Sequence, residues 1–347
     1  MLQSQLDLRA QDISTVLNAF SSVDFKQEDL LETFLGSLAQ EPLLSEASPA
    51  ALCLSFNALA RLRWRASDAQ AADVLRTLAE KAKSQLQDLG PVGLTQLLHA
   101  CARLPPLRKH GMVEGILERA HDKLDTFPAQ SLSLLVHACA RMQQKDVPLL
   151  TKAAKCIAPL LPEFTAQALA MTAYSFAKIE VRSEILFYLL AEQIIQKMPL
   201  FSGQGVGLAL QAYGKLQIDN KKLVQACRKH VRALSDELTL WEVDAIEQGF
   251  EKLNALDGSS AALLRSLRRR LGSQHPAQAD PWAEVEDSLL RRMAEEPPAT
   301  KTPAVPSEPS EPSAPEREPR RVPDASLDLW ELWKNADKDV KEAPVEG

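Results

Sequence analysis

The sequence predicts an all-α protein: a right-handed α-solenoid of about seven αα-hairpin repeats, followed by a disordered acidic tail. The first observation is that one amphipathic helical pattern returns every ~37 to 42 residues between residues 10 and 272, which is typical of stacked repeats. The second is that the alternation of β-branched and aromatic residues that marks strands is missing. We therefore expect a repeat domain over 10–272 and a separate tail over 273–347.

The clearest copy of the pattern is the stretch Phe164 to Ile179, which reads FTAQALAMTAYSFAKI. Its residues Leu169, Phe176 and Ile179 follow the i, i+7, i+10 spacing of a helix with one buried face. Related stretches run from Pro128 to Met142 and from Gly203 to Leu216. Each helix should pair with a second one, because a single amphipathic helix cannot bury its apolar face alone.

The copies align on a residue near the middle of each first helix, which we call position 0. Position 0 is occupied by Asn18, Asn57, His99, His137, Tyr174, Gln211 and Gln248. Position −5 is aliphatic in every copy, position +5 is aliphatic or Met, position +2 is large or apolar, and position +1 is small. A helical wheel places −5, −2, +2 and +5 on one face, which predicts the core. The small +1 residues should let a neighbouring helix approach closely.

The same wheel places positions −4, 0 and +4 opposite the core, so we expect these side chains to face solvent. Position +4 is a cation in every copy except the first, where it is Ser22. This set, which we call the cation row, consists of Arg61, Arg103, Arg141, Lys178, Lys215 and Lys252.

The elements follow in order along the chain. The first repeat should contain helices over 11–23 and 27–40, and two prolines predict a loop over 41–49. Ser48 followed by Pro49 is an N-cap with proline at the first helical position, and it should open the second repeat. The later second helices are expected near 69–86, 110–124, 147–161, 183–197, 222–234 and 260–271.

Composition changes after residue 272. Residues 273–347 carry 17 acidic and 9 basic side chains, so the tail accounts for the net charge of −6 and the repeats are near neutral. A short helix is expected over 281–296, and the Pro, Ser and Glu content of 297–323 predicts disorder. Leu329, Trp330 and Trp333 then form either a partner-docking segment or an apolar cluster that folds back on the last repeat.

The sequence contains only weak signals for a membrane protein, a secreted protein, a cofactor-binding protein or an enzyme. No apolar run is long enough for a membrane span, and no secretory signal is visible. Five cysteines, two of them at the core position +2, indicate a reducing compartment without disulfides. His99 and His137 lack further ligands at metal-site spacing, and Gly203 to Gly207 follows no strand, so neither a metal nor a nucleotide cofactor is expected. Because no catalytic constellation is recognisable, we expect no enzyme.

The helix Leu169 to Ile179 and its relatives, such as Leu132 to Met142, resemble the repeat helix of octotricopeptide and heptatricopeptide repeat proteins. The same helix occurs in the FAST-kinase-domain family and in helical subunits of the mitochondrial RNA-editing substrate-binding complex. The resemblance implies a protein of a mitochondrion or chloroplast that acts on RNA together with protein partners of an RNA or ribosomal complex. Two features differ: the usual aromatic at position 0 is present only as Tyr174, and the tail lacks the pattern of a RAP-type module.

The leading functional hypothesis is non-catalytic binding of single-stranded RNA. In this hypothesis the cation row contacts phosphates, and position 0 contacts bases through Asn57, His99, His137, Tyr174, Gln211 and Gln248. Three alternatives stay open. The row can simply complement helix dipoles, the same surface can hold a protein as in an armadillo-like scaffold, and the chain can assemble a complex without touching RNA. The basic run Arg265 to Arg270 is either an extension of the RNA track or a solvated terminal cap.

Overall fold

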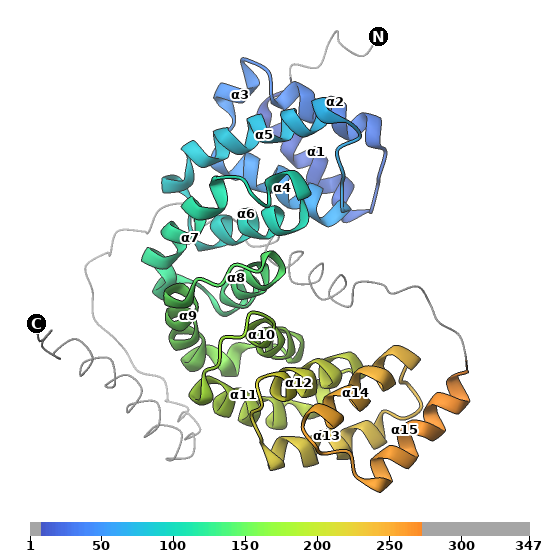
Figure 1. The fold of residues 1–347 in the computed structure, drawn as a ribbon. Helices are drawn as coiled ribbons and strands as arrows, with labels where there is room; N and C mark the ends of the chain where they lie inside the picture. Colours follow the sequence, from blue (N-terminus) through green and yellow to red (C-terminus); the bar gives the residue numbers. More distant parts are fainter. Residues whose placement is uncertain (1–7, 273–347) are drawn as a thin grey trace, which may run out of the picture.

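The computed structural model describes residues 8–272, and over that range every regular element is a helix. The helices pair into seven αα-hairpins that stack into a curved solenoid with two helical layers (Figure 1). The predicted all-α solenoid is therefore confirmed for these residues. The tail lies outside the described residues, and with it lie the helix expected over 281–296 and the proposed docking residues Leu329, Trp330 and Trp333.

The first helices of the hairpins form the inner layer, where each one packs against the first helix before it and the one after it. This layer consists of α1 (Ala10–Ser22), α4 (Pro49–Leu62), α6 (Pro91–Arg103), α8 (Ala129–Met142), α10 (Ala166–Lys178), α12 (Gly203–Lys215) and α14 (Leu240–Lys252). Figure 1 shows these helices on the concave side of the curve.

The second helices form the outer layer on the convex side (Figure 1). They are α2 (Glu28–Leu38), α5 (Ala69–Ser84), α7 (Met112–Lys123), α9 (Val147–Leu160), α11 (Glu184–Gln196), α13 (Lys221–Ala233) and α15 (Gly258–Leu271). One further short helix, α3 (Leu43–Glu46), lies within the segment 41–49 that was expected to be a loop. Ser48 caps α4 as predicted, since its hydroxyl accepts a hydrogen bond from the Ala51 amide at 3.2 Å.

The core lies between the two layers and follows the predicted columns. Every aliphatic residue at position −5 is at most 1% exposed. At position +2, Tyr213 is buried with its ring edge against Phe187, and its hydroxyl donates to the Phe187 carbonyl at 2.5 Å. Val23 at position +5 of the first repeat is the clear exception, at 75% exposed. Val23 belongs to the first repeat, and the described residues contain no earlier repeat that could cover its side chain.

The small residues at position +1 allow the inner helices to approach closely, as predicted. Ala58, Ala100, Ala138 and Ala212 are fully buried. At Gly249 of α14 the approach is closest, because an added Cβ would lie 2.5 Å from the Leu210 Cβ and 3.1 Å from the Leu210 carbonyl carbon of α12. Real Cβ atoms do not reach such distances, so this contact requires glycine.

Six of the seven inner helices end in the same way. The residue at position +6 adopts the left-handed conformation, and the next backbone N–H donates to the carbonyl at position +2. This is the hydrogen bond of a Schellman C-cap, which turns the chain sharply out of the helix. The left-handed residues are Asp24, Arg63, Gln143, Glu180, Gln217 and Asn254, and the third repeat has Pro105 instead. The repeated cap gives position +4 a nearly constant location in the last helical turn.

Side chains at the ends of outer helices join successive repeats. Lys123 donates to the Leu89 carbonyl at 3.2 Å, and Lys197 donates to the Phe164 carbonyl at 2.6 Å. The accepting carbonyls lie just before the inner helix of the same hairpin, at the turn where the preceding repeat ends. These bonds satisfy backbone groups that the turns would otherwise leave unpaired.

The close contact at Gly249 predicts a stability change. Gly249→Ala should force α12 and α14 apart and lower the free energy of unfolding by about 1–3 kcal/mol, measured by denaturant unfolding. Gly258→Ala in α15 is the matched control, because nothing lies within 4 Å of the Cβ it would add. Equal stability of the two variants would contradict the tight inner-layer packing.

Candidate nucleic-acid interface

The cation row follows one edge of the inner layer. Each of its six residues lies in the last turn of its inner helix, and these helices are direct neighbours. The repeated C-cap explains the alignment in five of the six helices, since its left-handed residue lies two positions after the cation. The remaining helix, α6, ends at Arg103 itself. The structure therefore brings the predicted phosphate-binding residues into one row along the solenoid.

Exposure along the row is uneven. Lys215 and Lys252 are exposed, whereas Arg103, Arg141 and Lys178 are half-buried. Arg61 is only 7% exposed, so the prediction that it faces solvent is wrong. Arg61 is buried because its guanidinium reaches back to the preceding repeat, where its Nη2 donates to the Ser21 carbonyl at 3.2 Å.

Lys215, the fifth member of the row, makes an equivalent contact. Its ammonium donates to the Lys178 carbonyl at 3.3 Å and forms an ion pair with Glu180 at 3.4 Å. In both cases the cation meets the C-terminal carbonyls of the preceding inner helix, where the helix dipole concentrates partial negative charge. The alternative that the row serves helix ends therefore has direct geometric support at these two positions.

The side chains at position 0 are less exposed than predicted. Asn57, His99 and His137 are at most 2% exposed, so the expectation that these base-contacting candidates face solvent is wrong. Tyr174 and Gln211 are half-buried, and Gln248 is exposed. The position −4 residues of the first six repeats are buried as well: Ser14, Cys53, Thr95, Ser133, Ala170 and Gly207.

Neighbouring inner helices account for part of this burial. His137 Nδ1 lies 3.3 Å from the Ser175 hydroxyl of α10, and Gln211 donates to the Ala245 carbonyl of α14 at 3.4 Å. At position −4, the Ser133 hydroxyl lies 3.0 Å from that of Thr172. A helical wheel with one buried face omits these contacts, because an inner helix in a solenoid has its own outer helix on one side and neighbours on two more.

Asn57 is an unusual case within this set. It is fully buried, and neither its side-chain nitrogen nor its oxygen has a hydrogen-bond partner. Leaving a buried amide unpaired is costly. Among the position 0 residues, Asn57 is therefore a strained part of the packing and not an open base-reading group.

Two of the four arginines in the basic run on the last helix form ion pairs with neighbouring residues. Arg268 pairs with Asp244 and Glu247 of α14, and Arg270 pairs with Asp236 in the turn before α14. These contacts hold α15 against the preceding helix. Arg265 and Arg269 are exposed, without an ion pair among residues 8–272. The contacts of Arg268 and Arg270 favour the terminal-cap alternative, and an RNA contact by Arg265 or Arg269 stays a prediction.

Sequence reasoning missed a second basic surface, which lies on α13. This outer helix has five Lys or Arg residues and no Asp or Glu between Lys221 and Ala233. The sequence did contain a signal for this surface. The apolar residues Leu223, Cys227 and Val231 share one buried face of the helix, and the five cations surround that face without any carboxylate. Repeat alignment concealed this signal, because the columns compared only the first helices.

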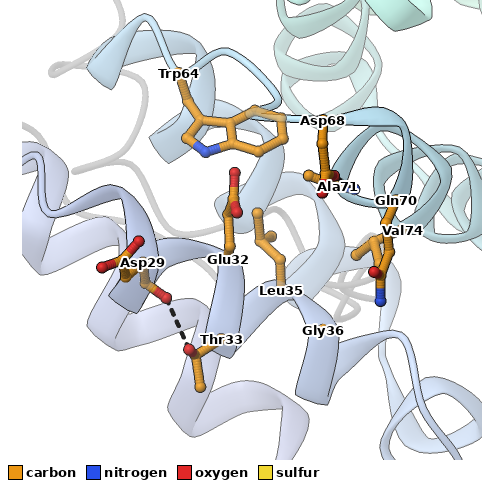
Figure 2. Close-up of a pocket in the computed structure, with 10 residues that line it drawn as sticks. All are labelled: Asp29, Glu32, Thr33, Leu35, Gly36, Trp64, Asp68, Gln70, Ala71 and Val74. Atoms are coloured by element: carbon orange, nitrogen blue, oxygen red, sulfur yellow. Dashed lines mark hydrogen bonds between the residues drawn. The ribbon is translucent and has the colours of Figure 1, made fainter.

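An acidic pocket of about 340 Å³ lies at the opposite end of the solenoid, between α2 and α5 (Figure 2). Asp29, Glu32 and Asp68 contribute carboxylates, and the buried Trp64 forms one wall. Two of these carboxylates already have partners: Glu32 accepts hydrogen bonds from Ser67, and Asp68 caps α5. The negative lining does not suit a phosphate.

The described residues hold no group of three or more His, Cys, Asp or Glu side chains placed to bind a metal ion. The segment that opens α12 is helical, and Gly207 packs on Ala245, where an added Cβ would lie 2.9 Å from the alanine Cβ. Within 8–272, no helix combines the length and apolar character that a bilayer crossing requires.

All five cysteines are free thiols. Burial raises the pKa of Cys53, Cys101, Cys139 and Cys227 to about 12. Burial, together with a hydrogen bond to Asp125, also raises the pKa of Cys156 to about 12. Since the thiolate is the reactive species, these groups are poor nucleophiles near neutral pH.

The raised pKa values predict that the cysteine thiols of the native protein react slowly. Native protein at pH 8 should show no rapidly reacting thiol with a disulfide reagent, and unfolding in guanidinium should expose all five. A rapid stoichiometric reaction of native protein would contradict the pKa shifts. Cys156→Ser is the control that assigns any such reaction, because Cys156 is the one half-buried thiol.

Comparison with known proteins gives one family match. A family model described as RNA-editing substrate-binding complex 6 protein matches residues 6–273, which is the whole helical body described above. A search of curated proteins found no match. The finding supports the part of the resemblance that concerns RNA-editing complexes, and the relation to octotricopeptide, heptatricopeptide and FAST-kinase-domain proteins stays a prediction.

Proposed function

Because the chain belongs to the family of the RNA-editing substrate-binding complex 6 protein, we propose that it binds single-stranded RNA without catalysing a reaction, as one subunit of a larger RNA-processing assembly. The observation that carries this proposal is the cation row, in which six successive inner helices each place a Lys or Arg at the same edge of the solenoid. One positive side chain per repeat suits a strand that runs along the stack.

The geometry narrows the proposed contact. Arg61 is buried against the preceding repeat, so five members of the row remain as phosphate contacts. Half-buried Tyr174 and Gln211 and exposed Gln248 are the position 0 side chains with access to a base. Stacking on a tyrosine ring tolerates every base, and amides recognise base edges by hydrogen bonds. We therefore propose that the base contacts are confined to the last three repeats, while phosphate contacts extend along the five remaining cations.

We further propose that the protein works in the mitochondrion with protein partners of an RNA-editing complex. The support is the family description, together with the resemblance to helical subunits of a mitochondrial complex. Nothing in the family match favours the chloroplast. The tail residues Leu329, Trp330 and Trp333 are proposed contacts to a protein partner, because Leu and Trp residues within an acidic segment of the sequence suit an apolar groove.

The row predicts a defined salt dependence of RNA binding. Five phosphate contacts should give a slope of log K against log salt of about −3.5, at about −0.7 per phosphate. Arg141→Glu/Lys178→Glu should weaken binding of a labelled single-stranded RNA and reduce the slope by roughly 1.4. Fluorescence anisotropy over a salt series measures both quantities.

The matched control is Arg76→Glu/Lys83→Glu, which reverses one Arg and one Lys exposed on the outer helix α5. It produces the same change in net charge away from the row. If the two double variants bind RNA equally well, the row does not contact RNA, and its cations serve the helix ends.

A protein-interaction scaffold is the second candidate function, and the acidic pocket between α2 and α5 favours it. Its carboxylates and the adjacent Trp64 suit an arginine side chain from a protein partner (Figure 2). A labelled tetra-arginine peptide tests this candidate. Saturable binding that Asp29→Asn/Glu32→Gln removes supports the scaffold function, and binding that the substitutions leave unchanged counts against the pocket.

A further inference from the structure

Helix α13 carries the most one-sided charge distribution of the described helices. Its residues Leu223, Val224, Cys227 and Val231 are buried in the core. Four of its five cations, Lys221, Lys222, Lys229 and Arg232, are exposed on the remaining surface. Arg228 instead reaches toward the inner layer, where its guanidinium lies 5.9 Å from the centre of the Phe250 ring of α14. No carboxylate on α13 offsets these cations.

Two of these cations form bonds to a neighbouring part of the protein. Arg228 pairs with Asp257 through its Nε at 3.3 Å and also donates to the Ala255 carbonyl. Arg232 donates to the Ser259 hydroxyl at 2.7 Å. These bonds fix α13 against the segment that leads into α15, and they leave a groove between the two.

The groove has a volume of about 580 Å³, and its charged lining residues are Lys222, Arg228, Lys229, Arg232 and Asp257. Asp257 is the one carboxylate among them, and its negative charge is already satisfied. It caps α15 by accepting a hydrogen bond from the Ser260 amide at 2.7 Å, and bonds from Ser260, Ser259 and the Arg228 charge lower its pKa to about 2. We call this surface the α13 groove.

Three lysines of α13 are not committed to any such bond. Lys221, Lys222 and Lys229 are exposed and have no ion pair among residues 8–272. The cation row differs, since Arg61 and Lys215 are bound to helix-end carbonyls. Unpaired ammonium groups at this density repel one another, so an anion bound between them is favoured.

The spacing of the cations suits an extended polyanion. Lys222, Lys229 and Arg232 follow one stripe of the helix, because they are separated by seven and three residues. At 1.5 Å per residue the stripe is about 15 Å long. A strand that lies along α13 meets these three side chains one after another.

We propose that the α13 groove binds the phosphate backbone of single-stranded RNA, as a contact separate from the cation row on the inner layer. This assignment rests on the proposed RNA-binding function and adds a second surface to it. Because phosphates are the same at every nucleotide, the groove increases affinity without reading sequence. RNA that contacts both surfaces crosses from the concave to the convex side near the last two repeats.

Two other anionic partners fit the groove less well. A lipid surface usually attracts a basic helix that also inserts apolar side chains, and the apolar face of α13 is buried in the core. An acidic protein shares the charge complementarity, but the family description concerns RNA editing and favours the nucleic acid.

The test compares full-length Lys222→Ala/Lys229→Ala with wild type, using a labelled 30-nucleotide RNA of mixed sequence in anisotropy titrations over a salt series. Loss of two phosphate contacts should lower affinity roughly 20-fold at 0.1 M salt and reduce the salt slope by about 1.4. The control is Lys26→Ala/Lys83→Ala, which removes two lysines exposed in the first two repeats. Thermal unfolding confirms that each variant is folded, and the single variants Lys222→Ala and Lys229→Ala replace a double variant that is not.

The outcomes separate this inference from the proposed function. If the groove variant binds like the control while Arg141→Glu/Lys178→Glu loses affinity, the inference is wrong and the proposed function stands. If the groove variant loses affinity and the row variant does not, the groove is supported and the row is rejected. Absence of RNA binding by wild type overturns both. A labelled polyglutamate peptide that binds the groove more tightly than RNA would assign it to an acidic protein instead.

Discussion

The structure depends on the side-by-side packing of the inner helices. Small residues at positions −4 and +1 let these helices approach until backbone and Cβ atoms touch, most closely at Gly249 against Leu210. An αα-hairpin has too little apolar surface to be stable alone, so this contact joins seven hairpins into one core. The outer helices add bonds such as that from Lys197 to the Phe164 carbonyl, which secure the junctions.

This packing also determines which charged side chains are accessible to solvent. Inner helices are covered on three sides, and the cations of the row lie near the helix ends, where carbonyl groups already attract them. Arg61 and Lys215 show that attraction directly. An outer helix has one fully open side, so the lysines of α13 extend into solvent and form no ion pair with the part of the chain that the structure describes. The two basic surfaces therefore differ in origin: one is tied to the repeat, and the other is peculiar to the sixth hairpin.

Charge is also distributed unequally along the solenoid. The first outer helix, α2, has three acidic residues and no Lys or Arg, whereas α13 and α15 have nine Lys or Arg together and no Asp or Glu. The family match covers this whole body, so both ends belong to the part of the chain that relates it to RNA editing. This distribution of charge favours a polyanion at the C-terminal end of the stack and disfavours one at the N-terminal end, where the acidic pocket lies.

The sequence by itself determined the fold class, the number of hairpins, the core columns at −5 and +2, and the presence of a cation in each of the last six repeats. These features depend on spacing within one helix, which is written in the chain. Tertiary structure decided which polar residues are accessible. Asn57, His99 and His137 are polar, yet they are buried, and part of the cover, such as Ser175 over His137, comes from residues about one repeat away. Periodicity describes a single helix, whereas exposure depends on all the neighbours that a helix acquires when the repeats stack.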